Sequence, residues 1–159
     1  MSSAGKTMAL GVLVVCGGCG GGGAATGEVE AYKLASMATE AKVMLTQLGR
    51  DARALYVEQA ALPSVAAPLT PTPPCCDGPR HQCPVDRAAW SAEPWASLGF
   101  ELSDPHRFRY SFQPTPTGFV ATAVGDLDCD GQAVTFTLTG TIVDGAVQLA
   151  PLAEPATLD

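Results

Sequence analysis

Basic residues are scarce in this sequence, which has 9 Lys and Arg against 16 Asp and Glu and a formal net charge of −7 over 159 residues. Proteins that bind nucleic acid neutralise its phosphates with clustered lysines and arginines, whereas the few basic residues here are scattered along the chain. We therefore expect no nucleic-acid partner. The acidic balance otherwise indicates only solubility and repulsion from anionic surfaces.

The start of the chain lacks a long apolar run. The apolar stretch Met8–Val15 has eight residues, whereas a membrane-spanning helix needs about 20. It follows a short polar segment that carries Lys6, and it runs into small residues, which is the layout of a secretory signal. We therefore predict that residues 1–18 form a signal peptide, which is removed on export.

Recognisable catalytic motifs are missing as well. The sequence has no Gly-x-Ser-x-Gly elbow, no phosphate-binding loop and no convincing pair of cysteine and histidine. Glu93, Glu101 and Asp104 lie close together in the sequence, but exposed acids that flank a core segment are ordinary. We expect no enzymatic activity.

The cysteines that end the apolar stretch resemble the lipobox of bacterial lipoproteins, in which a hydrophobic residue and two small residues precede an acylated cysteine. Before Cys19, the two small residues are Gly17 and Gly18, but Cys16 stands where the hydrophobic residue should be. Before Cys16, the bulky Val15 stands where a small residue should be. We favour Cys19 as the lipidation site and keep Cys16 as the alternative; cleavage among the glycines without a lipid is the third interpretation. The resemblance implies an exported protein, anchored by its lipid to the outer membrane or the cell surface.

Cleavage before Cys19 leaves four further cysteines: Cys75, Cys76, Cys83 and Cys129. An even number is typical of an oxidising compartment, and four cysteines allow three pairings. Adjacent cysteines rarely bridge each other, so we expect one of the vicinal pair to bond Cys83 and the other Cys129. Zinc bound with His81 is not expected, because Cys75, Cys76, His81 and Cys83 contain no Cys-x-x-Cys pair. His81 lies in a predicted solvated loop and His106 begins a predicted strand, so we expect surface or capping roles for both.

A helix is predicted from Glu28 to Ala60. Apolar residues recur there at steps of four and three, at Leu34, Ala38, Ala41, Leu45, Leu48, Ala52 and Leu55. We expect this stripe to be a core face, and association of the helix with a copy of itself or with another helix is the alternative. Gly49 costs about 1 kcal/mol of helix stability relative to alanine, which permits a bend there.

Seven prolines between Pro63 and Pro84 argue against a helix or a central strand in this segment. The segment is therefore predicted to be a long connecting loop, stapled by the three cysteines inside it. Rigid exposed loops present side chains to a partner at low ordering cost. We accordingly predict that the loop Leu62–Pro84 is a functional surface; the alternative is a passive spacer.

The C-terminal half alternates apolar and polar residues as strands do. The apolar positions are Phe108, Tyr110 and Phe112, then the segment 119–124, then Val134, Phe136 and Leu138, and finally 142–149 around an Asp144-Gly145 turn. Short helical turns at 86–90 and 94–100 add the apolar anchors Trp90, Trp95, Leu98 and Phe100. The pattern predicts three or four antiparallel strands.

The expected fold class is thus α+β, with a long N-terminal helix packed on a three- to four-stranded antiparallel sheet and a Pro-rich, disulfide-stapled loop between them. We place a Gly-rich linker at residues 19–27, one domain at 28–150 and a frayed tail at 151–159. The helix stripe should bury itself against the sheet face that carries Phe108, Tyr110, Phe112 and Phe136.

This order of elements and several short segments resemble type IV pilins and pilin-like proteins of deltaproteobacterial lineages. The segments are Glu40-Ala41-Lys42 with Leu45, Arg53–Tyr56, Trp95–Phe100, Ser103–His106 with Phe108 and Tyr110, Ala121–Ala123, Gly125–Asp128 and the strand around Phe136. The resemblance covers about Leu34 to Thr139. It implies a pilin-like head that acts through protein contacts or adhesion, with a protein partner or a pilus or secretion machinery.

The chain departs from polymerising pilins at Gly20–Gly27, where those proteins carry a long apolar helix. The resemblance therefore extends to the head and not to filament formation. We expect a non-catalytic envelope lipoprotein with a structural, adhesive or protein-binding role. The alternative is a minor pilin or pseudopilin whose reading frame begins upstream of Met1.

One local motif is typical of cation binding. Asp126, Asp128 and Asp130 stand at alternate positions before Gly131, as in the first half of a calcium loop. Thr137 stands where the closing carboxylate of such a loop would be, so the motif is incomplete. The alternative is an Asp- and Gly-rich turn held by Cys129. We expect no other cofactor.

Overall fold

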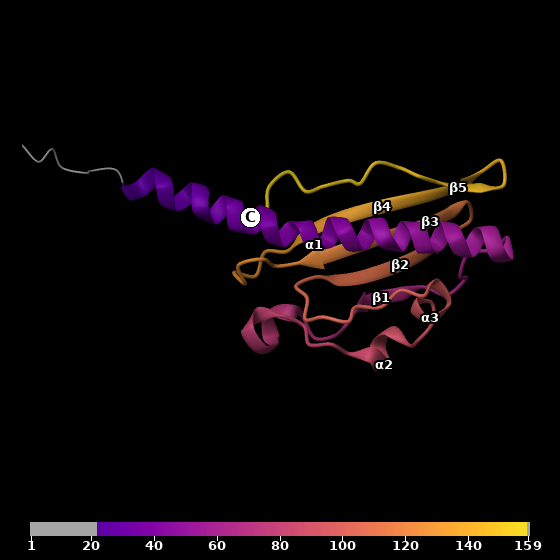
Figure 1. Ribbon diagram of the computed structural model, residues 1–159, viewed down its shortest axis with the longest axis horizontal. Helices are drawn as coiled ribbons and strands as arrows, with labels where there is room; N and C mark the ends of the chain where they lie inside the picture. The colour runs from indigo at the N-terminus through magenta and orange to yellow at the C-terminus, as the bar shows by residue number, and fades with distance from the viewer. Residues whose placement is uncertain (1–21, 159) are drawn as a thin grey trace, which may run out of the picture.

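The computed structural model describes residues 22–158 and has the α+β class that the sequence predicts (Figure 1). In chain order its elements are α1 (Gly22–Gln59), β1 (Ala67–Thr70), the 3-10 turns η1 (Cys75–Asp77) and η2 (Pro79–His81), α2 (Arg87–Trp90), α3 (Trp95–Leu98), β2 (Arg109–Thr115), β3 (Gly118–Gly125), β4 (Val134–Val143) and β5 (Ala146–Leu149). Residues 22–27, which we predicted to be linker, belong to α1.

The sheet has five antiparallel strands in the order β1-β2-β3-β4-β5, so the prediction of three or four was too low. The additional strand is β1, which lies inside the Pro-rich segment and pairs with β2 at Ala67–Phe112 and Thr70–Tyr110. Its position explains why prolines are tolerated, because an edge strand needs its hydrogen-bonding groups on one side only. Strands β4 and β5 join at the predicted Asp144-Gly145 turn, where both residues have positive φ.

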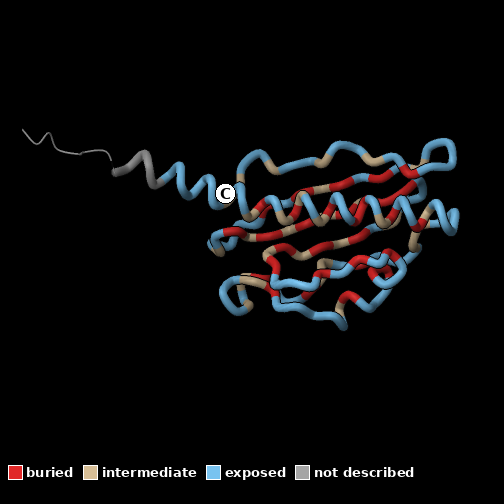
Figure 2. The backbone as a smooth tube through the Cα atoms, viewed as in Figure 1, coloured by how far each residue is buried: buried red, intermediate tan, exposed pale blue. Residues whose placement is uncertain are grey.

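Helix α1 lies along one face of the sheet and packs on β3, β4 and β5 (Figure 1). The predicted stripe is confirmed: Ala38, Ala41, Leu45, Leu48, Ala52 and Leu55 are buried, and Leu34 packs at the edge of the same core. Buried and exposed residues alternate along the helix in Figure 2. Gly49 lies on the buried side, where a Cβ would come within 2.8 Å of Leu138 and 2.9 Å of Leu149, so its lack of a side chain lets the helix approach the sheet closely.

An aromatic cluster covers the part of the buried face that α1 leaves open. Trp90 and Trp95 meet at 5.3 Å between ring centroids, and both contact Phe100. Phe100 in turn packs edge-on against Tyr110 of β2 at 5.6 Å. The predicted anchors are therefore core residues, and they join α2 and α3 to the sheet.

The tail that we expected to be frayed follows the edge of β4 beyond β5. Ala150 donates its N–H to the carbonyl of Thr139, and Ala153 and Thr137 exchange both backbone hydrogen bonds. Glu154 then forms an ion pair with Lys42 of α1. The residues after Leu149 thus complete the strand pairing of β4, because their N–H and C=O groups find partners there.

Candidate functional site

Two disulfides fix the Pro-rich loop, and their pairing resolves the alternative that the sequence left open. Cys75 bonds Cys83 and closes a loop with a sequence separation of 8, whereas Cys76 bonds Cys129 across a separation of 53. The predicted pattern, in which one vicinal cysteine bonds Cys83 and the other Cys129, is confirmed. The second disulfide ties η1 to the turn between β3 and β4.

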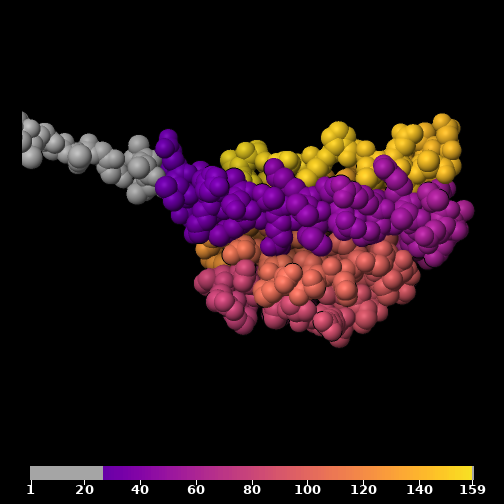
Figure 3. Space-filling view, in the orientation of Figure 1, coloured from indigo at the N-terminus to yellow at the C-terminus, as the bar shows by residue number. Residues whose placement is uncertain are grey.

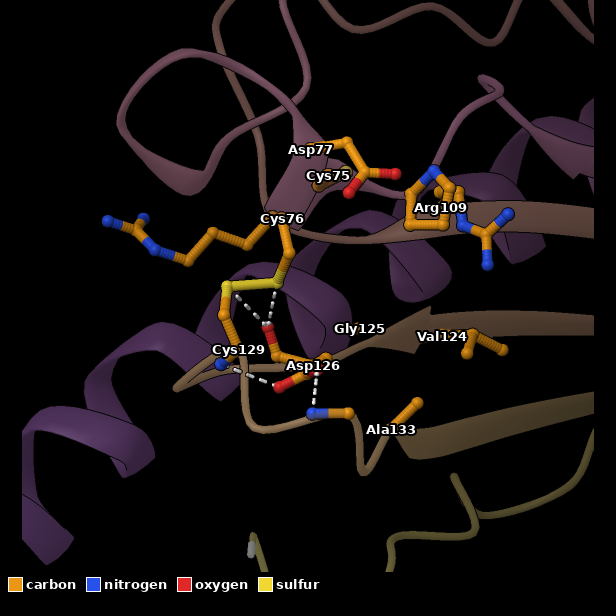
Figure 4. Close-up of a pocket in the computed structure, with 12 residues that line it drawn as sticks. Cys75, Cys76, Asp77, Arg109, Val124, Gly125, Asp126, Cys129 and Ala133 are labelled. Atoms are coloured by element: carbon orange, nitrogen blue, oxygen red, sulfur yellow. Dashed lines mark hydrogen bonds between the residues drawn. A yellow bond between two sulfur atoms is a disulfide. The ribbon is translucent and has the colours of Figure 1, made fainter.

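A hollow of about 410 Å³ lies beside the Cys76–Cys129 disulfide (Figure 4). Its charged lining residues are Asp77, Asp126, Arg107 and Arg109. Arg109 of β2 precedes the buried Tyr110, so its side chain belongs to the sheet face opposite α1. Arg107 stands just before β2 and also lines a second hollow with Val29–Met37 of α1. The two guanidinium groups face a lining that also holds two carboxylates, so the hollow is polar and its formal charges balance. Among the residues that the structure describes, the lining contains no histidine, serine or free cysteine.

The predicted cation motif lies in the turn between β3 and β4, on one side of this hollow. Asp126, Asp128 and Asp130 bring carboxylate oxygens within 4.8 Å of one another. In the structure Asp126 accepts the N–H of Cys129 at 2.7 Å and that of Gly131 at 2.8 Å. Asp128 accepts the N–H of Asp130, and Asp130 that of Gln132. The three carboxylates thus stabilise the turn through their own backbone, and calcium binding stays a prediction.

Replacing Asp126 by alanine should lower the free energy of unfolding by about 1–3 kcal/mol, because two backbone donors of the turn lose their acceptor. The measurement is urea unfolding in the presence of a chelator, so that any calcium contribution is absent. Asp128→Ala is the matched control, since Asp128 is exposed and accepts one hydrogen bond. Equal losses for the two variants would show that Asp126 has no special role in the turn.

A partly buried carboxylate, Glu40 of α1, holds the start of β2 against the helix. Its oxygens accept the backbone N–H of Arg107 at 2.9 and 3.1 Å and that of Phe108 at 3.1 Å, and the Tyr110 hydroxyl lies 3.4 Å away. Burial raises the pKa of Glu40 above its ordinary value, although the two backbone hydrogen bonds act in the opposite direction. The sequence alone could not predict these contacts, because the partners of Glu40 lie 67 and 68 residues away.

The raised pKa of Glu40 predicts a specific dependence of stability on pH. The folded state binds the proton more tightly than the unfolded state, so this contribution is fully present below the ordinary carboxyl pKa and is lost as pH rises through the raised value. Glu40→Gln removes the titration. The free energy of unfolding of this variant, relative to the parent, should therefore increase as pH rises through that interval.

The measurement is urea unfolding of parent and Glu40→Gln at a series of pH values across the carboxyl range. Glu58→Gln is the control, because Glu58 is an exposed residue near the end of the same helix. Parallel profiles for the parent and Glu40→Gln would contradict the prediction, since they would mean that Glu40 titrates alike in the folded and unfolded states.

The two histidines have different surroundings. His81 is exposed in η2, in agreement with the solvated loop position expected from the sequence. His106 is only 2% exposed, although we expected a surface or capping role for it. The reason is the isolated pairing of His106 with Cys83, which draws the imidazole beneath the disulfide loop. Sequence spacing could not reveal this contact, because the two residues lie in different segments.

The predicted signal peptide and both candidate lipidation cysteines, Cys16 and Cys19, lie outside the described residues. Within residues 22–158, no helix combines the length and the apolar character needed to cross a bilayer. Comparison with known proteins gave no match: no protein-family model, no curated protein and no solved structure is detectably similar to this chain.

Proposed function

We propose that this chain is an exported, lipid-anchored protein of the cell envelope, with a pilin-like head that binds another protein and does not catalyse a reaction. A lipid on Cys19, or on Cys16 in the alternative, anchors the chain to the membrane. The protein partner contacts the loop Leu62–Pro84. A structural or adhesive role at the outer membrane or cell surface follows from this arrangement.

The observation that carries the proposal is the fastening of the Pro-rich loop at three places. Strand β1 pairs with β2, Cys75 bonds Cys83, and Cys76 bonds Cys129. Between these points Pro68 and the residues 72–74 remain exposed. A surface that is rigid before binding loses little conformational entropy when a partner docks, which favours a binding role over a spacer.

The direction of α1 supports anchoring at the N-terminal side. Residues 27–33 are all exposed, and this part of α1 projects beyond the sheet in Figure 1 and beyond the body in Figure 3. A helix rises 1.5 Å per residue, so this segment adds about 10 Å between the head and any anchor that precedes it. An anchored head would then stand clear of the lipid surface.

The pilin resemblance supports the same class of function through the order of elements: a long helix, a variable loop and an antiparallel meander. The alternative proposal, a minor pilin or pseudopilin with an upstream start, is favoured by α1, which has 38 residues and projects at its beginning. Reading the gene upstream of Met1 tests it. An in-frame apolar stretch preceded by a glycine cleavage site would favour the pilin.

The anchor can be tested by changing the proposed lipidation site. Cys19→Ser, expressed as the full chain in a diderm bacterium, should move the protein from the membrane fraction to the soluble fraction. Intact-mass analysis of the parent should give a mature chain that begins at Cys19 and carries acyl chains. Cys16→Ser is the matched control and should stay with the membrane. A parent of unmodified mass that begins elsewhere would end the lipoprotein proposal.

A further inference from the structure

His106 has a buried ring nitrogen without a partner. The residue is 2% exposed, and its Nε2 makes no hydrogen bond. Its Nδ1 lies 3.1 Å from the carbonyl oxygen of Asp104, which can only accept a hydrogen bond. That contact places the ring proton on Nδ1 and leaves the lone pair on Nε2. A buried acceptor without a donor is costly, which calls for an explanation.

The sulfurs of Cys75 and Cys83 lie next to this imidazole. One ring nitrogen of His106 and the two sulfurs are all within 4.8 Å of one another, and all three residues are buried. Two backbone hydrogen bonds hold His106 beside Cys83. The N–H of Cys83 donates to the carbonyl of His106 at 2.7 Å, and the N–H of His106 donates to the carbonyl of Cys83 at 3.1 Å. The disulfide and the imidazole therefore form one cluster in the core of the loop.

We propose that this cluster is a metal site of the reduced protein. When a dithiol reductant transfers two electrons and two protons to the Cys75–Cys83 disulfide, the reductant becomes a disulfide and the two cysteines become thiols. The two thiols then lose their protons and, with Nε2 of His106, bind one Zn²⁺ ion. A disulfide oxidant that takes two electrons from the two thiolates becomes a dithiol, and the Cys75–Cys83 bond forms again as the metal ion leaves. The cluster thus has a crosslinked state and a metal-bound state.

The donor set and its support match those of zinc. Thiolate and imidazole are the preferred zinc ligands, and three protein ligands leave one position open. With Zn–S bonds of about 2.3 Å in a tetrahedral site, the sulfurs of Cys75 and Cys83 would lie about 3.8 Å apart. The hydrogen bond from Nδ1 to a backbone carbonyl is the contact that commonly orients a zinc-binding histidine.

A second group of possible ligands, Cys76, Cys129 and Asp126, lies about the other disulfide. These residues are only partly buried, and the Asp126 oxygens already accept backbone N–H groups. No side-chain nitrogen or oxygen of this group is buried without a partner. The structure therefore favours the His106 cluster, and the experiment must distinguish the two groups.

The test uses the full chain, unfolded and reduced, then refolded without oxygen in the presence of one equivalent of Co²⁺, since a buried site fills most readily as the chain folds. Thiolate-to-cobalt charge-transfer absorption should appear, and Zn²⁺ should displace it. Alkylation of the zinc-loaded protein, read by mass spectrometry, should show that Cys75 and Cys83 are protected and that Cys16, Cys19, Cys76 and Cys129 stay reactive. Absence of the absorption, or protection of Cys76 and Cys129 instead, would overturn the proposal.

His106→Asn isolates the imidazole, because the asparagine amide can still donate to the Asp104 carbonyl but has no counterpart of Nε2. Zinc affinity should fall by more than the roughly 10–100-fold that loss of an outer-shell partner costs. His81→Asn, in the same loop, is the matched control and should bind zinc like the parent. An unchanged affinity in His106→Asn would refute the site; far-ultraviolet circular dichroism of its oxidised form checks the fold.

Discussion

Replacing Leu48 by aspartate is expected to unfold the domain. Leu48 is fully buried in the middle of the α1 stripe, in the same core as Phe108, Phe112 and Phe136. Loss of a buried leucine side chain costs about 2–5 kcal/mol. An unpaired carboxylate in its place adds several more. The sum approaches the whole stability of an ordinary domain, about 5–15 kcal/mol.

The matched control for this change is Val43→Asp on the same helix. Val43 is 58% exposed, so its carboxylate stays in water and should cost little. Circular dichroism and urea unfolding of the two variants give the comparison. If Leu48→Asp unfolds at the same urea concentration as the parent, then this face of α1 is not in the core, and the helix packs elsewhere in solution.

Removal of the Cys76–Cys129 disulfide should have the second largest effect on stability. Closing a loop with a sequence separation of 53 removes much freedom from the unfolded chain, and the loop-entropy relation gives about 4 kcal/mol for it. The same relation gives about 2.5 kcal/mol for the Cys75–Cys83 loop, which has a separation of 8. We therefore expect Cys76→Ser with Cys129→Ser to lower the urea midpoint more than Cys75→Ala with Cys83→Ala.

Limited proteolysis adds an independent measurement on the same variants. With both disulfides intact, the segment between Ala66 and Pro74 should resist cleavage, because β1 is paired within it. Protection should be lost when the disulfides are reduced or when Cys76 and Cys129 are replaced. Rapid cleavage of the intact protein would mean that the loop is mobile, and we would then abandon the binding surface in favour of the passive spacer.

The sequence was sufficient to predict the elements whose pattern is local. The apolar stripe of α1, the alternation through Phe108, Tyr110 and Phe112, and the Asp144-Gly145 turn each follow from neighbours a few residues apart. Cysteine chemistry narrowed the disulfides to two pairings, because adjacent cysteines strain a bridge. These features were enough to predict the fold class and the disulfide that ties the loop to the turn between β3 and β4.

Contacts between distant segments could not be predicted in the same way. Strand β1 was missed because Pro68, the second of its four residues, argues against a strand. The proline is acceptable there only because β1 lies at the edge of the sheet. The hydrogen bond from the backbone N–H of Arg107 to Glu40 joins residues that lie 67 positions apart in the sequence. Burial of His106 depends on its pairing with Cys83, and no periodicity encodes that encounter.

The residues that follow β5 have a consequence for how the molecule behaves in concentrated solution. By pairing with Thr137 and Thr139 they occupy the open edge of β4, which would otherwise offer free N–H and C=O groups to a strand of another molecule. A chain shortened after Leu149 would expose that edge and invite strand exchange and aggregation. Purification tags and fusion partners therefore belong after Leu158, so that the paired residues and the packed Leu152 and Leu158 stay in place.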